Sequence, residues 1–252
     1  MTNIHAIILA AGKGTRMNSS KPKVLQILAD NTLLGHVLKQ AKLVSQQIHV
    51  VYGFGGNQVK QTINDDSINW VEQVEQLGTG HAVQQATPHI EEDSVSLILY
   101  GDVPLIQQTT LEQLIDASKT SGIALLSVAL EDPTGYGRII RNNETIQAIV
   151  EQKDANVEQL KVCEVNTGIM AVQTALLKKY LSGLDANNAQ GELYLTDIIE
   201  SAVNDGKTVA SVITIDESEV AGVNDKVQLA ELERIYQQQK SDQYMQQGLS
   251  LK

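Results

Sequence analysis

The chain has 252 residues, of which 42% are hydrophobic, 19% charged and 4% aromatic, and its formal net charge is −11. This length allows one large domain or two small ones, the single cysteine excludes an internal disulfide framework, and the acidic balance argues against a general nucleic-acid binder. No apolar run approaches the roughly 18 residues of a membrane span and no signal peptide is recognised, so we expect a cytoplasmic protein without membrane partners.

The expected elements alternate between strands and helices. A fully apolar run at 5–10 predicts a buried strand, and the helical spacing of Leu and Val over 33–44 predicts a helix. Thr109 and Glu112 have the spacing of a capping box, which predicts a helix from there to about Ser121. Three more apolar runs predict strands at 47–53, 95–102 and 123–130.

The pattern changes after Pro133. Three shorter runs with more polar alternation, GYGRII, TIQAIVEQ and EVNTGIMAV, predict an antiparallel or mixed extension of the sheet. The remaining elements are helices near 174–181 and 193–204, a strand at 208–215, and a long helix from Asn224. The fold class is therefore α/β, with a mostly parallel mixed sheet and helices on both faces. We expect one domain over 1–226 and a linker helix with a polar tail over 227–252.

The first 29 residues form a basic segment in an acidic protein. They contain no Asp or Glu but carry Lys13, Arg16, Lys21 and Lys23, a charge of +4, whereas the other 15 basic and 30 acidic residues leave −15. Such a segment suits a compact anionic ligand better than a polymer, although a solvated basic loop has the same composition.

The loop A-A-G-K-G-T-R follows the first strand. Gly12 and Gly14 permit positive φ and close backbone approach, so that consecutive N–H groups can face an anion, although a glycine pair also makes an ordinary turn. Arg16 and Lys23 add two cations, which match the charge of a triphosphate.

Two common phosphate-binding motifs do not fit this loop. The dinucleotide fingerprint needs glycine where Met17 stands, and no acidic residue follows the second strand to bind a ribose. The P-loop fails because Lys13 precedes Gly14 and the spacing is wrong. An NAD-dependent oxidoreductase is therefore disfavoured.

Asp102 ends an apolar strand, at the edge of the sheet where ligands of α/β proteins bind. It is either a turn residue or a carboxylate that holds Mg²⁺, which needs only one or two protein oxygens beside phosphates and water. Asn224 is either the cap of the last helix or a second metal ligand. The metal interpretation requires Lys23 and Asp102 to share one cleft.

Two further segments have both a structural and a functional interpretation. In E-Q-L-G-T-G-H-A, a glycine turn precedes a helix that Thr79 caps, or else its exposed backbone reads the edge of a base. Glu151 and Asn166 lie near glycine breaks on late strands and would otherwise be ordinary edge-strand residues. The five histidines show no metal-ligand spacing.

Several motifs together resemble one enzyme family. L-A-A-G-K-G-T-R-M followed by K-P-K is shared by many nucleotidyltransferases. The combination with E-Q-L-G-T-G-H-A, L-Y-G-D-V-P-L, D-P-T-G-Y-G-R-I, E-V-N-T-G-I and N-N-A-Q-G-E-L-Y-L-T-D resembles bacterial N-acetylglucosamine-1-phosphate uridyltransferases, from the start of the chain to about Tyr236. The resemblance implies a Rossmann-like nucleotidyltransferase fold of the GT-A type.

The resemblance also implies a reaction: UTP and N-acetylglucosamine 1-phosphate give UDP-N-acetylglucosamine, a cell-wall precursor, and pyrophosphate, by in-line attack on the α-phosphorus with Mg²⁺. Arg16 and Lys23 match catalytic residues, and Asp102 and Asn224 match metal ligands. Matches to nucleotide-binding positions are Leu9, Ala10, Ala11, Gly12, Gly14, Gln73, Gly78, Thr79, Tyr100 and Gly101. Matches to sugar-phosphate-binding positions are Gly137, Glu151, Asn166 and Thr196.

The sequence departs from the family pattern in one respect. Family members usually continue into a left-handed β-helix of hexapeptide repeats that transfers acetyl groups and forms trimers, and this sequence shows no such repeats. We therefore expect uridylyl transfer without acetyl transfer, in a monomer or weak oligomer. A transferase for another nucleotide or sugar phosphate and a non-catalytic nucleotide sensor remain alternatives.

Overall fold

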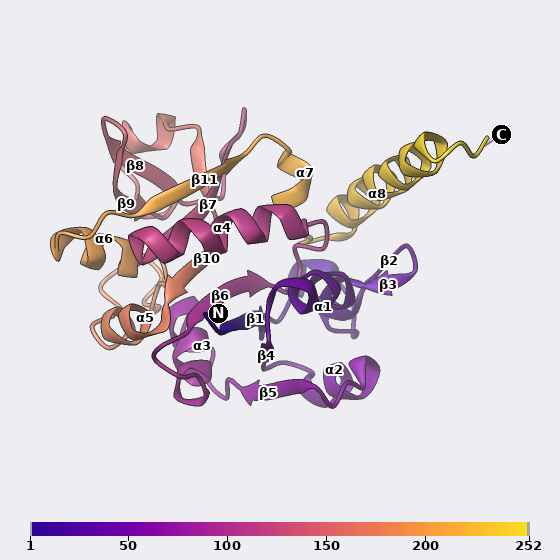
Figure 1. Cartoon of the computed structure of the whole chain (residues 1–252), viewed down its shortest axis with the longest axis horizontal. Helices are drawn as coiled ribbons and strands as arrows, with labels where there is room; N and C mark the ends of the chain where they lie inside the picture. Colours follow the sequence, from indigo (N-terminus) through magenta and orange to yellow (C-terminus); the bar gives the residue numbers. More distant parts are fainter. Residues whose placement is uncertain (1, 251–252) are drawn as a thin grey trace.

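A central mixed sheet organises the computed structural model, which describes residues 2–250 (Figure 1). Its main path runs in the order β11-β7-β10-β6-β1-β4-β5. Neighbouring strands are parallel except β10, which runs antiparallel to both β6 and β7. The strands are β1 (Ile4–Ala10), β4 (Gln47–Tyr52), β5 (Ile68–Glu72), β6 (Val95–Tyr100), β7 (Ile123–Ala129), β10 (Glu164–Gln173) and β11 (Ala210–Thr214). The predicted mostly parallel mixed sheet is confirmed.

Helices cover both faces of this sheet, as the sequence predicts. All seven residues of β1 are buried, with Ile8 in the core on one face and Ile7 in the core on the other. Burying one such side chain contributes about 1.5–3 kcal/mol. The first core is closed by α1 (Leu33–Val44) and α4 (Gln108–Ser121), and the second by α3 (Thr79–Ala86), α5 (Thr174–Leu181) and α6 (Asp197–Asn204).

Two small antiparallel pairs extend the fold. β8 (Arg138–Asn142) and β9 (Thr145–Val150) form a hairpin that joins the main sheet where Val165 of β10 pairs with Arg138. This hairpin confirms the predicted antiparallel extension. The other pair is β2 (Ile27–Leu28) with β3 (Asn31–Thr32). Two further helices are short: α2 (Gly56–Ile63) and α7 (Glu217–Val220).

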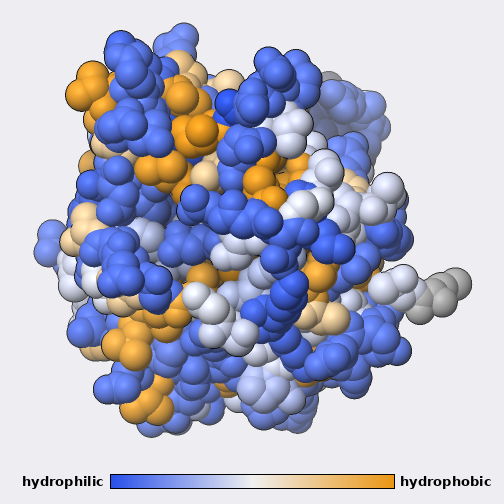
Figure 2. All heavy atoms as spheres, turned by 90° about the vertical axis from the view of Figure 1, so that its left-hand side faces the viewer, coloured by the Kyte–Doolittle hydropathy of each residue, from blue (hydrophilic) through white to orange (hydrophobic). Residues whose placement is uncertain are grey.

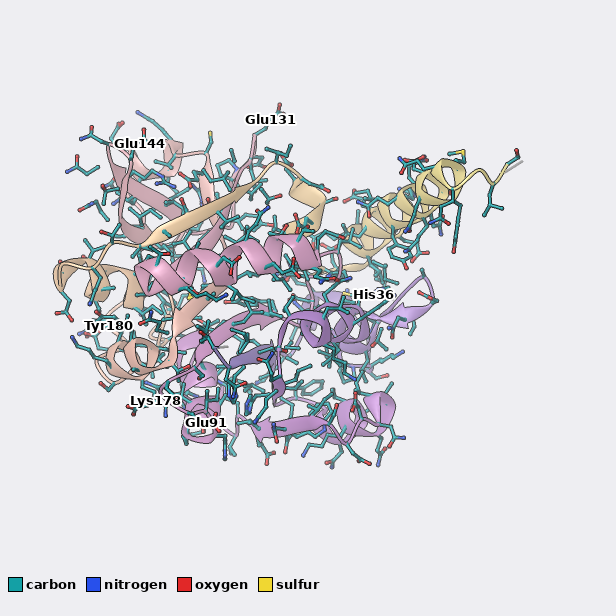
Figure 3. The ribbon with its side chains drawn as sticks, viewed as in Figure 1. His36, Glu91, Glu131, Glu144, Lys178 and Tyr180 are labelled. Carbon is teal, nitrogen blue, oxygen red and sulfur yellow. The ribbon has the colours of Figure 1, made fainter. Side chains whose placement is uncertain are left out.

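The last helix, α8 (Lys226–Gln246), projects from the body of the molecule (Figure 1). Its base is packed, because Leu232 is buried in a small apolar cluster with Met17 and Val223. Tyr236 also contacts His36 edge-on, with ring centroids 5.3 Å apart; Figure 3 labels His36. Within residues 2–250, no helix combines the length and the apolar character that crossing a membrane requires.

Three predicted helix starts are wrong. No capping box opens α4, which begins at Gln108 because the backbone N–H of Gln107 donates to Glu219 Oε1 (3.0 Å). α6 begins at Asp197 rather than near 193, since Leu193 is held outside the helix by backbone hydrogen bonds to Leu77 and Gly80 (2.8 Å each).

The third concerns the last helix. Asp225, not Asn224, caps α8: its carboxylate accepts hydrogen bonds from the backbone N–H groups of Val227 (2.8 Å) and Gln228 (2.9 Å). The capping interpretation of Asn224 therefore fails, and its side chain is left for other contacts.

The topology creates a crevice at one edge of the sheet. From β1 the chain proceeds to β4 and β5 on one side, and it then returns to β6 on the other side of β1. Loops that leave the carboxyl ends of β1 and β6 therefore diverge, which is where α/β sheets of this kind bind ligands.

Candidate functional site

The glycine loop after β1 is built around Lys23. Gly14 has φ +57 and precedes a short 3-10 turn that buries Met17. A Cβ on Gly14 would lie 2.6 Å from Lys23 Cβ, so glycine is needed there for close approach. Gly12 differs from the prediction: its φ lies outside the left-handed region, and a Cβ there would meet nothing within 4 Å.

Four side chains meet where this loop faces the end of β6. The Lys23 ammonium forms an ion pair with Asp102 Oδ2 and donates to Asn224 Oδ1 (3.2 Å). Arg16 Nη2 donates to the same Asn224 oxygen (3.0 Å). The side chains of Lys23 and Asp102 are each 14% exposed. The requirement that Lys23 and Asp102 share one cleft is met.

A cleft of about 420 Å³ opens beside this cluster. The catalytic match Lys23 and both predicted metal ligands, Asp102 and Asn224, line this cleft. Most of the predicted nucleotide-binding residues line it too: Leu9, Ala10, Ala11, Gly12, Gln73, Gly78, Thr79 and Tyr100. Gly14 and Gly101 support its wall instead; the N–H of Gly101 donates to the carbonyl of Leu9 (2.9 Å). Sequence reasoning missed Gln76 and Glu192, which also line the cleft.

One corner of the cleft is made of backbone. Gly78 has φ +114, and a Cβ there would lie 2.6 Å from the carbonyl oxygen of Leu193, so only glycine fits. Gln73 is 3% exposed, and its side-chain amide nitrogen donates to the Gly78 carbonyl (3.1 Å). Thr79 does not cap α3, because Gly78 occupies that position and the Thr79 hydroxyl accepts from Leu195 N (3.1 Å).

The four predicted sugar-phosphate residues also come together. Thr196 Oγ1 donates to Glu151 Oε1 (3.1 Å), and Asn166 N donates to the Gly137 carbonyl (2.8 Å). A Cβ on Gly137 would lie 3.3 Å from both Glu151 oxygens. Burial raises the pKa of Glu151. Asn166 is buried, and its Oδ1 has no hydrogen-bond partner within the described chain.

A second hollow of about 320 Å³ meets the first, and the two share Tyr100, Asp102 and Asn224. Arg16 lines the second hollow. Sequence reasoning missed five of its other residues: Thr134, Gly135 and Tyr136, which lie in the motif D-P-T-G-Y-G-R, and Thr167 and Gly222, which lie outside it. Burial raises the pKa of Tyr136, with a smaller contribution from the charge of Asp102.

The shared residues fit a magnesium ion. Asp102 and Asn224 offer carboxylate and amide oxygens, the donors that Mg²⁺ prefers, and the contacts with Lys23 and Arg16 show that the position favours cations. Across residues 2–250, no group of three or more His, Cys, Asp or Glu side chains could hold a metal ion. A magnesium ion held by two protein oxygens would take its remaining oxygens from water or a bound phosphate.

Comparison with known families decides what kind of domain this is. A model of the MobA-like NTP transferase domain matches residues 6–162. The chain belongs to this family. It is therefore a nucleotidyltransferase domain, and the cleft at the β1 loop lies within the matched residues and the segments that fold against them.

Curated relatives extend the match to the whole chain. The chain is 68% identical over 252 residues to the bifunctional protein GlmU of Ruthia magnifica subsp. Calyptogena magnifica, covering 100% of this chain and 56% of the relative. It is 56% identical over 245 residues to the bifunctional protein GlmU of Acinetobacter baumannii (strain AYE), covering 97% of this chain and 54% of the relative. The chain thus spans about half the length of these relatives.

Solved structures with similar folds are also nucleotidyltransferases. UDP-glucose pyrophosphorylase complexed with UDP-glucose superposes with a TM-score of 0.76 at 16% identity, covering 95% of this chain and 100% of that chain. A putative glucose-1-phosphate thymidylyltransferase from Bacillus anthracis, in complex with a sucrose, gives 0.71 at 18% identity, covering 92% and 94%. At these identities the likeness establishes the fold, and it confirms the predicted Rossmann-like class.

Behind the sugar-phosphate residues lies an acidic hollow of about 410 Å³. Its lining includes Glu151, Asp154, Asp185, Asp197 and Glu200. The molecular face over α5 and α6 is largely hydrophilic (Figure 2). Burial, followed by the charges of these neighbouring carboxylates, raises the pKa of Asp197 to about 6.

This raised pKa predicts how stability depends on pH. The unfolded pKa of Asp197 is near 3.8, so between about pH 4 and 6 the native state holds a proton that the unfolded state has lost, and stability falls as pH rises. We expect Asp197→Asn to unfold at a higher urea concentration than the wild type at pH 7.5, with the difference vanishing near pH 4.

Asp205→Asn, at the other end of the same helix, is the matched control. A hydrogen bond from Lys179 lowers the pKa of Asp205, so the charge of Asp205 does not destabilise the native state and removing it brings no gain at pH 7.5. If Asp197→Asn were no more stable than the wild type at pH 7.5, the charge of Asp197 in the acidic hollow would not destabilise the native state.

Proposed function

We propose that this domain transfers a uridylyl group from UTP to N-acetylglucosamine 1-phosphate, which gives UDP-N-acetylglucosamine and pyrophosphate. The observation that carries the proposal is the junction of two hollows at Asp102 and Asn224, with Lys23 and Arg16 beside it. Two phosphorylated substrates can meet there end to end. The high identity to proteins named GlmU supports these substrates.

The first cleft suits the nucleotide. Its glycine loop presents backbone N–H groups to an anion, and Lys23 and Arg16 add charge near the phosphates. The backbone corner at Gly78, braced by Gln73, offers fixed groups for the edge of a base. A buried polar edge of this kind discriminates strongly, because a wrong base leaves its groups without partners. We infer that this corner selects uracil.

The second hollow suits the sugar phosphate. Glu151 and Asn166 do not line this hollow, but both contact Gly137 beside the Tyr136 loop, and their side-chain oxygens offer acceptors for sugar hydroxyl and amide groups. Tyr136 supplies an apolar face with a hydroxyl, the usual combination at a sugar site. The phosphate of this substrate would then lie toward Asp102 and Asn224, where both hollows open.

The chemistry needs positioning more than proton transfer. The oxygen of a sugar 1-phosphate is already anionic at pH 7, so it attacks the α-phosphorus without a general base, and no histidine among the described residues lines either hollow. Lys23 and Arg16 hold the triphosphate and meet the charge that develops on pyrophosphate. Magnesium held by Asp102 and Asn224 would supply further neutralisation between the two phosphates.

Pyrophosphate release tests this function. With UTP, N-acetylglucosamine 1-phosphate and Mg²⁺, we expect one pyrophosphate and one UDP-N-acetylglucosamine per turnover, no release in EDTA, and kcat/KM for CTP lower by about 100-fold or more. Binding of UTP without pyrophosphate release would indicate a nucleotide sensor. Comparable kcat/KM values for UTP and CTP would refute the role of the Gly78 corner.

Gly12→Ala separates ligand binding from folding. Because the added methyl group meets nothing and φ is permissive, the free energy of unfolding should change by less than about 0.5 kcal/mol. The methyl group would stand in the cleft where the phosphates approach, so UTP affinity measured by calorimetry should fall about tenfold or more.

Gly183→Ala is the matched control, since Gly183 also lies outside the left-handed region, has only an ordinary contact at 3.7 Å, and lines the acidic hollow instead of the cleft. It should leave UTP affinity unchanged. Unchanged affinity in Gly12→Ala as well would remove the glycine loop from the binding site.

A further inference from the structure

Arg138 is a buried cation that the proposed reaction does not use. It is 2% exposed and stands at the start of β8, next to Gly137. Within the described part of the chain its guanidinium belongs to no ion pair, and its Nε has no hydrogen-bond partner. Burying a cation without a counter-charge is costly, so the fold retains Arg138 against a penalty.

The guanidinium instead binds two neighbouring chain segments. Its Nη1 donates to the backbone carbonyl of Tyr136, and its Nη2 donates to Gln152 Oε1 (2.8 Å). The same Gln152 oxygen accepts from the backbone N–H of Gly135 (3.2 Å). Hydrogen bonds from a charged donor are among the stronger ones in proteins. Arg138 and Gln152 therefore fasten the 133–137 loop to the end of β9.

This loop forms one wall of the second hollow. Thr134, Gly135 and Tyr136 all line that hollow, opposite Asp102 and Asn224. The other contacts of the loop lie at its ends and on the ring of Tyr136: a turn from Pro133 to Tyr136 (3.2 Å), a cap by Asp132, the bond from Asn166 N to the Gly137 carbonyl (2.8 Å), and packing of Tyr136 on the core. Arg138 and Gln152 hold the middle of the loop, at Gly135 and at the Tyr136 carbonyl.

The hydrogen bond from Arg138 to Gln152 also connects the loop to Glu151, one of the predicted sugar-phosphate residues. Glu151 precedes Gln152 and packs against Gly137, which is the residue before Arg138. A shift of the loop would therefore move Tyr136 and Glu151 together. The first cleft has neither residue in its lining and would keep its shape.

We propose that Arg138 is a positioning residue for the sugar phosphate, acting through Tyr136, Gln152 and Glu151 without touching the substrate. This inference rests on the proposed function. It explains why a cation that forms no ion pair within the described chain is buried next to this loop. It also predicts that loss of Arg138 affects one substrate and leaves the other alone.

Steady-state kinetics of Arg138→Met test the inference. We expect KM for N-acetylglucosamine 1-phosphate to rise about tenfold or more, since two charge-assisted hydrogen bonds are lost, while KM for UTP stays within about twofold. Arg138→Lys keeps the charge and can replace one of the two bonds, so it should recover part of the affinity. Gln152→Met leaves Arg138 in place, releases the same loop and should raise the same KM, which keeps the test decisive if Arg138→Met does not fold.

Arg141→Met is the matched control on the same strand. Arg141 pairs with Glu164 (2.7 Å) and donates to the carbonyl of Glu144 (2.8 Å), which Figure 3 labels, and it lines neither hollow of the site. It should lower stability without changing either KM.

The outcomes separate the two claims. If the wild type releases no pyrophosphate, the proposed function fails. If the wild type is active but both KM values rise together in Arg138→Met, or neither changes, or Gln152→Met leaves the sugar-phosphate KM unchanged, Arg138 is structural and the inference is overturned.

Discussion

The ion pair between Lys23 and Asp102 joins the two halves of the site. It connects the glycine loop after β1 to the end of β6, across 79 residues of sequence, and Asn224 adds the segment before α8. Both partners are largely buried, and removing one partner of such a pair typically costs about 3–5 kcal/mol. Without ligand, Lys23 neutralises a carboxylate that would otherwise be unpaired. In the proposed function, a bound phosphate would give Lys23 another anion and leave Asp102 free to hold a metal ion.

The rest of the fold places these groups. Buried parallel strands bring the carboxyl ends of β1 and β6 to one edge of the sheet. Because β4 and β6 pair with opposite sides of β1, the loops that follow β1 and β6 diverge and open the crevice there. The loop before the β8–β9 hairpin adds a second wall with Tyr136, and Glu151 and Asn166 contact Gly137 beside it. One antiparallel extension of a standard α/β sheet thus contributes to the second hollow, which the proposed function assigns to the sugar phosphate.

The sequence predicts the parts of this site that depend on local chemistry. Apolar runs locate β1 and β6, and residue type identifies Lys23 and Asp102. It does not predict contacts set by tertiary packing. Glu219, far along the chain, fixes the start of α4, and Leu77 keeps Leu193 out of α6. Arg138 has no local signal, because its burial follows from how the loop folds over β10.

The affinity for UTP with and without Mg²⁺, in the wild type and in Asp102→Asn, tests the central claim most directly. If Asp102 exchanges Lys23 for a metal ion when phosphates bind, Mg²⁺ should tighten UTP binding to the wild type about tenfold or more and have no effect on Asp102→Asn. An equal gain from Mg²⁺ in both proteins would show that the carboxylate at the end of β6 is not the metal anchor.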